Sequence, residues 1–192
     1  MAIAIKNATL FDGSGKAPWG PVTVLVEDDT IKTIRPAAEF ELGEGIEIID
    51  AQGKFLMPGL IDSHVHITGS GDPNVLKAMK QSIPFQALKA SLHAKATLEA
   101  GFTAIRDAGA GFLVDVALKQ AIDQGLIPGP RMHVACHSLS ITGGHGDTRN
   151  GWPPHVEFLG RMVVDSPTKP GEQRESSSAM ELITSSCTLP EA

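Results

Sequence analysis

The first part of the chain alternates short apolar runs with pairs of turn-forming residues. Hydrophobic side chains recur at every second position in these runs, and turn pairs such as Asp12-Gly13 and Asp28-Asp29 separate them. This alternation is typical of half-buried β-strands joined by tight turns. The predicted strands cover residues 3–8, 22–27, 31–35 and 46–50. We therefore expect a small antiparallel sheet that precedes the main domain.

A different pattern begins at Phe55, where apolar strands alternate with longer segments of helical periodicity. A first strand ends at His64 and His66, and further strands are predicted over 102–107 and 132–139. Helices are predicted over 84–100 and 113–124; the first has Phe85, Leu88, Leu92 and Ala96 at helical spacing, and Gly101 ends it. This β-α-β-α-β order predicts an α/β fold with a parallel sheet and right-handed crossovers.

Two histidines stand at the end of the first of these strands, in the order His64-Val65-His66. Because side chains alternate along a strand, both imidazoles project to the same side, which suits two ligands of one metal ion. The spacing alone also fits two ordinary polar side chains on a wet face. The apolar run before the pair and the glycines after it place the histidines where a buried strand opens into a loop, and active sites of parallel barrels lie at that end.

Four segments of the chain carry a further signal: GKFLMPGLIDSHVHI, IKNATLFDGSG, AGFTAIRDAG and GPRMHVACHSLSITGGHGD. Together they resemble the amidohydrolase superfamily, most closely its imidazolonepropionase-like and Xaa-Pro dipeptidase (prolidase) branch. The resemblance covers about residues 1–165. It implies a partial (β/α)8 TIM barrel, limited to the first three β/α units and preceded by half of a small β-sandwich. The implied divisions are 1–54 for the sandwich segment and 55–165 for the barrel segment.

The resemblance also implies roles for particular side chains. His64 and His66 correspond to metal ligands of a centre with one or two divalent ions, zinc being the expected metal. His145, in the glycine-rich segment TGGHGD, corresponds to a histidine that faces the substrate; without the resemblance it reads as an exposed loop residue. Asp62 and Asp107 stand beside strand ends, where a carboxylate can orient a ligating imidazole or cap a turn. No catalytic residue is assigned, because the family's catalytic aspartate is expected downstream.

The last segment, residues 166–192, differs in composition from the barrel pattern. Its polar sequence is typical of a disordered tail. A frameshift is the favoured alternative, because the shifted reading frame permits D-E-A-R near its start and G-A-D-x-I-K near its end. The codons of Met180 and Glu181 fix the glycine of the second motif, which resembles the family's lysine-bearing strand.

Composition narrows the classes of partner and compartment. The net charge of -6 and the lack of a basic cluster argue against nucleic-acid partners, and no apolar stretch is long enough to span a membrane. The two cysteines fit a reducing compartment, so a cytoplasmic protein is expected. The expected partner is a small amide or dipeptide substrate, and a homo-oligomer is left open for the intact enzyme.

Together these observations predict the N-terminal part of a metal-dependent amidohydrolase that cleaves amide C–N bonds by metal-activated hydroxide. Xaa-Pro dipeptides and N-acyl amino acids are the expected substrates. We expect this chain alone to be inactive, because two imidazoles are fewer than the three protein ligands of a typical catalytic zinc site. The alternative is a non-catalytic metal-binding or interaction module.

Overall fold

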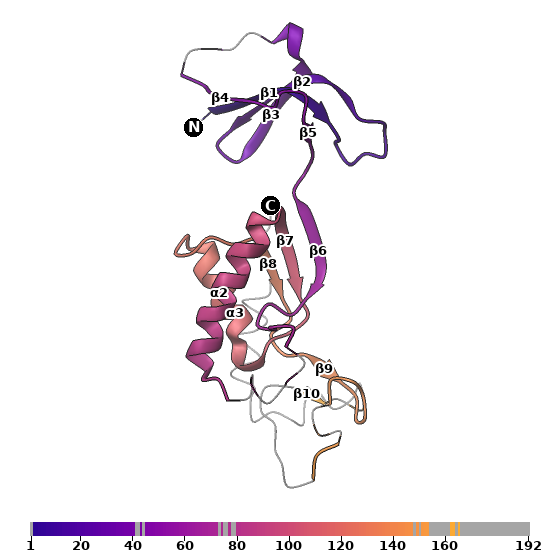
Figure 1. Cartoon of the computed structure of the whole chain (residues 1–192), viewed down its shortest axis with the longest axis vertical. Coiled ribbons are helices and arrows are strands. Elements are labelled where there is room, and N and C mark those ends of the chain that lie inside the picture. The colour runs from indigo at the N-terminus through magenta and orange to yellow at the C-terminus, as the bar shows by residue number, and fades with distance from the viewer. Residues whose placement is uncertain are drawn as a thin grey trace. The chain divides into compact units, whose positions relative to one another are not determined.

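The computed structural model describes residues 2–40, 43, 45–72, 74, 77, 80–147, 149, 151–153, 162–163 and 165 (Figure 1). The chain divides into two compact units, residues 1–58 and residues 59–192. The sequence pattern predicts a boundary between Lys54 and Phe55, and that boundary remains a prediction. The predicted divergent tail, residues 166–192, lies outside the described residues.

The first unit is a five-stranded sheet. Its strands are β1 (Ala2–Leu10), β2 (Trp19–Glu27), β3 (Thr30–Pro36), β4 (Glu47–Asp50) and β5 (Phe55–Leu56), in the order β3-β2-β1-β4, with β5 also paired to β1. Alternation along β1 and β2 buries Ala8, Leu10, Val22 and Val24 together. A short 3-10 helix, Ala37–Glu39, follows β3.

The expectation of an antiparallel sheet needs correction. β2 pairs antiparallel with β1 and with β3, but β4 and β5 both run parallel to β1. The reason is the connection after β3, which carries the chain from one edge of the sheet to the far side of β1. Phe55 and Leu56 also belong to this sheet, so the strand that leads to the histidines begins later, at Leu60.

The second unit contains the predicted β-α-β-α-β sequence. Its elements are β6 (Leu60–Val65), α2 (Ile83–Glu99), β7 (Phe102–Asp107), a 3-10 turn (Gly111–Leu113), α3 (Val114–Asp123) and β8 (Arg131–Val134). The three strands form a parallel sheet in the order β6-β7-β8, and α2 and α3 lie on one face of it (Figure 1). A second parallel pair, β9 (Leu139–Ser140) and β10 (Met162–Val163), lies beyond the carboxyl ends of these strands.

The predicted third strand, 132–139, is interrupted. β8 ends at Val134, and Cys136 adopts a positive φ of 66°, which extended backbone does not allow. The chain then resumes as the separate strand β9. The backbone thus turns at the carboxyl end of β8, beside the ends of β6 and β7.

The core of this unit lies between the sheet and its helices. Ile105 and Met132 from the strands pack with Ala90, Ala94 and Leu118 from the helices. Small alanines therefore form the buried face of α2. The larger residues of its predicted apolar face, Phe85, Leu88 and Leu92, are exposed within the described chain.

None of the helices in the described residues is both long and apolar enough to cross a membrane.

Candidate metal site

The two predicted ligands stand at the carboxyl end of β6. His64 is within the strand and His66 follows it, and both side chains are exposed. Their ring centroids are 5.5 Å apart with an interplanar angle of 83°. The backbone N–H of His64 donates to Oδ1 of Asp62 at 3.1 Å, and this hydrogen bond stabilises the strand backbone just before the two histidines. The structure thus brings both imidazoles to the same strand end.

The ring of His66 is held by a backbone carbonyl from the neighbouring strand end. Its Nδ1 lies 2.9 Å from the carbonyl oxygen of Gly109, which follows β7. Because a carbonyl oxygen only accepts hydrogen bonds, Nδ1 must carry the proton in this contact. The Nε2 lone pair is then left to bind a cation, which is the arrangement found at metal-ligating histidines. This donor chemistry fits a divalent metal ion.

Asp107 lies directly behind this contact. Its carboxylate is 0% exposed and accepts the backbone N–H of Ile67 at Oδ2 and that of Gly109 at Oδ1, each at 2.8 Å. Asp62 and Asp107 therefore both bind backbone N–H groups, and within the described part of the chain no hydrogen bond joins either carboxylate to an imidazole. The sequence position of Asp107 indicated an orienting role, but the link to His66 passes through Gly109.

A second buried carboxylate, Asp115, lies at the first turn of α3. It is 0% exposed and accepts the N–H of Cys136 at 2.9 Å and that of Val116 at 3.0 Å. Burial, with a further contribution from the negative charge of Asp107, raises the pKa of Asp115 to about 6. Sequence reasoning missed this residue, although an aspartate near a helix N-terminus is a recognisable capping signal.

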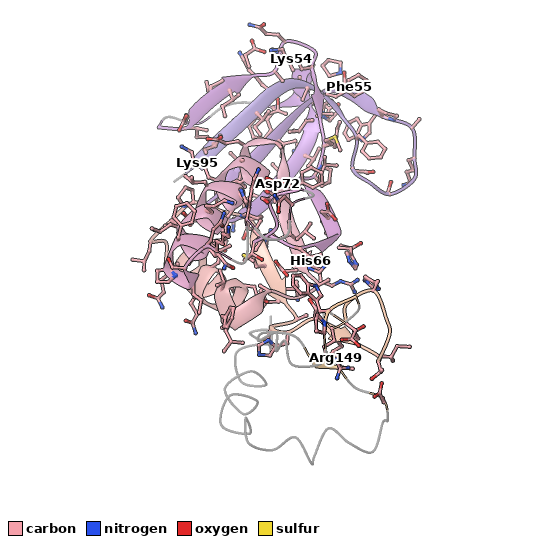
Figure 2. All side chains as sticks on the ribbon, turned by 60° about the horizontal axis from the view of Figure 1, so that its bottom comes forward. Lys54, Phe55, His66, Asp72, Lys95 and Arg149 are labelled. Carbon is pink, nitrogen blue, oxygen red and sulfur yellow. The ribbon has the colours of Figure 1, made fainter. Side chains whose placement is uncertain are left out.

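The third candidate, His145, is exposed in the loop that follows β9. Asp147, 4% exposed, organises this loop by accepting the N–H of Gly143 at 3.0 Å and two guanidinium hydrogen bonds from Arg149, at 2.8 and 3.0 Å. These contacts, that of Arg149 first, hold the pKa of Asp147 well below its usual range. Figure 2 shows Arg149 and His66 on the same side of the second unit, toward the carboxyl ends of its strands.

The opposite flank of the loop is fixed by a second carboxylate. Asp165 accepts the backbone N–H and the hydroxyl of Thr142, both at 2.7 Å. The same hydroxyl also accepts a longer contact of 3.4 Å from Arg149. No hydrogen bond or ring contact joins His145 to His64 or His66 among the described residues, so the structure does not bring the three imidazoles into direct contact.

The set of possible ligands is incomplete in the described part of the chain. That part contains no group of three or more His, Cys, Asp or Glu side chains able to hold a metal ion. His137, which follows Cys136, has a buried Nδ1 without a hydrogen-bond partner in the same part of the chain. His64 and His66, the two ligands that the sequence motif predicts, remain predictions, and the described residues add no third side chain to them.

Comparison with known proteins gives the family. The sequence model of the amidohydrolase family matches residues 55–185, so this chain belongs to the amidohydrolase family. The match includes the strand with His64 and His66 and the loop with His145, and it runs into the segment 166–192 that was predicted to diverge. The family is in general metal-dependent.

Two solved structures illustrate the likeness. A Xaa-Pro dipeptidase with bound methionine is 26% identical, with a TM-score of 0.79, over 97% of this chain and 45% of its own. A prolidase bound to N-methylphosphonate-L-proline is 28% identical, with a TM-score of 0.73, over 96% of this chain and 44% of its own. The family match confirms the predicted family, and both structures have the prolidase or Xaa-Pro dipeptidase activity that the sequence resemblance indicated.

A curated relative carries the name of a different enzyme of this kind. A dihydroorotase of Thermoanaerobacter sp. (strain X514) is 35% identical over 71 residues, which are 37% of this chain and 15% of that protein. The chain therefore spans less than half the length of each protein compared here.

Proposed function

We propose that this chain forms part of a metal-dependent hydrolase that cleaves the amide C–N bond of small N-acyl amino acids. The observation that carries the proposal is the pair His64 and His66 at one strand end, with His66 held through Nδ1 so that Nε2 keeps its lone pair. A divalent ion bound there, zinc by preference, would supply Lewis acidity toward a carbonyl and acidify water. The intact site would hold one or two such ions.

The chain's own residues would position this site and one side of the substrate pocket. The carbonyl of Gly109 orients His66, and the loop braced by Asp147 presents His145 to solvent. We assign His145 to substrate binding, where a neutral imidazole can donate to a carbonyl or carboxylate oxygen. No catalytic residue is assigned among the described residues.

The substrate class rests on similar proteins and is a proposal for this chain. Two of the similar solved structures are a prolidase and a Xaa-Pro dipeptidase, whereas the curated dihydroorotase has a name that denotes a different substrate. Dipeptides ending in proline are therefore the first substrates to test, followed by other N-acyl amino acids and cyclic amides.

The same comparisons support a proposal about architecture. We assign residues 55–165 to the first three β/α units of a TIM barrel and residues 1–54 to half of a β-sandwich. The parallel order β6-β7-β8, with helices on one face, is what the start of such a barrel requires.

A second candidate, a non-catalytic metal-binding module, is favoured by one observation. The proposed site has two imidazoles and the described residues contain no group of three possible ligands, whereas catalytic zinc sites normally keep three protein ligands. We therefore propose that the 192-residue chain by itself binds zinc weakly and has little or no hydrolytic activity.

Equilibrium dialysis with zinc tests the site. The wild-type chain should retain zinc, and His66→Gln should weaken retention at least tenfold because it removes one of two ligands. His133→Gln is the matched control, since His133 is an exposed histidine of β8. Equal retention by wild type and His66→Gln would refute the proposed site. Metal-dependent cleavage of a Xaa-Pro dipeptide by the wild-type chain would refute the expected inactivity.

A further inference from the structure

We propose that Asp107 is a positioning residue for His66, which it orients indirectly by fixing the carbonyl of Gly109. The role rests on the proposed function, in which His66 binds a metal ion through Nε2. It goes beyond the assignment of ligands because it names the group that selects the tautomer of one of them.

The path between the two side chains is continuous. Asp107 Oδ1 accepts the N–H of Gly109 at 2.8 Å, and the carbonyl oxygen of the same glycine lies 2.9 Å from Nδ1 of His66. Asp107 Oδ2 accepts the N–H of Ile67, the residue that follows His66, also at 2.8 Å. One carboxylate thus fixes the backbone on both sides of the imidazole contact.

The arrangement requires a carboxylate at position 107, because Asp107 is buried and uses both of its oxygens as acceptors. A carboxylate accepts at two oxygens, whereas an asparagine amide has one oxygen and a nitrogen that only donates. In Asp107→Asn, one of the two N–H groups would therefore face another donor. Because the side chain is 0% exposed, water cannot readily replace the lost acceptor.

Gly109 is suited to its part in this path by its backbone. Its φ of +119° is strained for a residue with a side chain, and an added Cβ would lie 2.4 Å from the backbone nitrogen of Ser138. Alanine at position 109 should therefore displace the carbonyl while leaving the Asp107 side chain in place. This gives a second, independent way to break the path.

Ser138 provides a control on the same carbonyl. Its hydroxyl donates to the Gly109 oxygen at 3.3 Å, a longer contact than that of His66. Ser138→Ala removes this donor and leaves the acceptor in place for His66. If the carbonyl position depends on Asp107, this variant should keep the His66 tautomer.

A structural role for Asp107 alone would affect stability without selecting a tautomer. The discriminating experiment is a long-range ¹H–¹⁵N NMR spectrum of the metal-free 192-residue chain with ¹⁵N-labelled histidine, at about pH 8, where imidazoles are mostly neutral. The His66 signal is assigned by its loss in His66→Gln. Wild type and Ser138→Ala should show the Nδ1–H tautomer, and Asp107→Asn and Gly109→Ala should shift His66 toward Nε2–H.

A zinc titration of the same samples separates this proposal from the proposed function. Asp107→Asn should weaken zinc binding by about 10- to 100-fold, as loss of a supporting partner does at other metal sites. A folded Asp107→Asn chain with an unchanged tautomer would overturn the positioning role, whatever the zinc result. If the four proteins show the predicted tautomers but the wild-type chain does not bind zinc, the positioning role is supported and the metal site is refuted. If neither Asp107→Asn nor Gly109→Ala folds, the tautomer of His66 in the wild-type chain is the deciding measurement. An Nε2–H tautomer in that chain overturns the proposal.

Discussion

Arg149 and Asp147 form a bidentate ion pair within the loop that contains His145. The guanidinium Nε donates to Oδ1 at 2.8 Å and Nη2 donates to Oδ2 at 3.0 Å, while the carboxylate also accepts the N–H of Gly143. Arg149→Met should leave the buried carboxylate short of partners and loosen the loop.

The measurement for this loop is amide hydrogen exchange at Gly143, which should be about tenfold faster in Arg149→Met. Arg131→Met is the control, because Arg131 is an exposed arginine of β8 outside the loop. Unchanged exchange at Gly143 would show that the ion pair does not hold the loop. Because the folded pKa of Asp147 is lowered, its stabilising contribution should be present above about pH 4 and be lost as the pH falls through the folded pKa.

Asp115 should give the opposite pH dependence. Its folded pKa of about 6 is above the ordinary value of 3.8, so the folded state binds the extra proton between these values. The stability that Asp115 contributes should therefore fall as pH rises from about 4 to about 6, by about 3 kcal/mol at most.

Denaturant unfolding of wild type and Asp115→Asn at about pH 3.5 and about pH 7 measures this contribution. The difference in unfolding free energy between the two proteins should change with pH in the stated direction. Asp29→Asn, at an exposed carboxylate, should show no comparable pH-dependent difference. A difference for Asp115→Asn that is constant with pH would contradict the raised pKa.

Two isoleucines of the parallel sheet offer a matched test of the core. Ile105 of β7 is 1% exposed and Ile61 of β6 is 72% exposed. Ile105→Ala should lower the free energy of unfolding by about 2–5 kcal/mol, because it removes buried surface and leaves a cavity. Ile61→Ala should change it by about 0.5 kcal/mol or less. If chemical denaturation showed similar losses of unfolding free energy for Ile105→Ala and Ile61→Ala, the assignment of Ile105 to the core would be wrong.

The strand and helix pattern was largely predictable because it depends on local periodicity. Residues 102–107 match β7, and the helix predicted over 84–100 is found over Ile83–Glu99. The early end of β8 was not predictable, because it depends on a positive φ at Cys136 that an apolar residue pattern does not indicate. The parallel pairing of β4 with β1 likewise depends on a long-range crossing of the sheet.

The positions of the two predicted ligands could be read from the sequence, whereas the contacts that hold them could not. His64 and His66 follow from a motif of adjacent residues, whereas the contact between His66 and Gly109 joins residues 43 positions apart. Helical spacing also failed to predict which face of α2 is buried: Ala94 is 0% exposed and Leu92 is 67% exposed. Periodicity identifies a helix, but its neighbours decide which side packs.

The segment after Pro167 carries a prediction at the nucleotide level. The shifted reading frame should encode the motifs D-E-A-R and G-A-D-x-I-K, the glycine of the second arising from the codons of Met180 and Glu181. Sequencing the nucleotides around Pro167 tests this frameshift hypothesis. Codons that cannot produce these residues in the shifted frame would rule it out.

His64 and His66 are proposed to bind one metal ion together. X-ray absorption spectroscopy of the zinc-loaded wild-type chain can detect this shared coordination. We predict two imidazole nitrogens at about 2.0–2.1 Å from zinc, and loss of that signal in the double variant His64→Gln/His66→Gln. A zinc environment without imidazole nitrogen, or a spectrum that the double variant leaves unchanged, would contradict the claim.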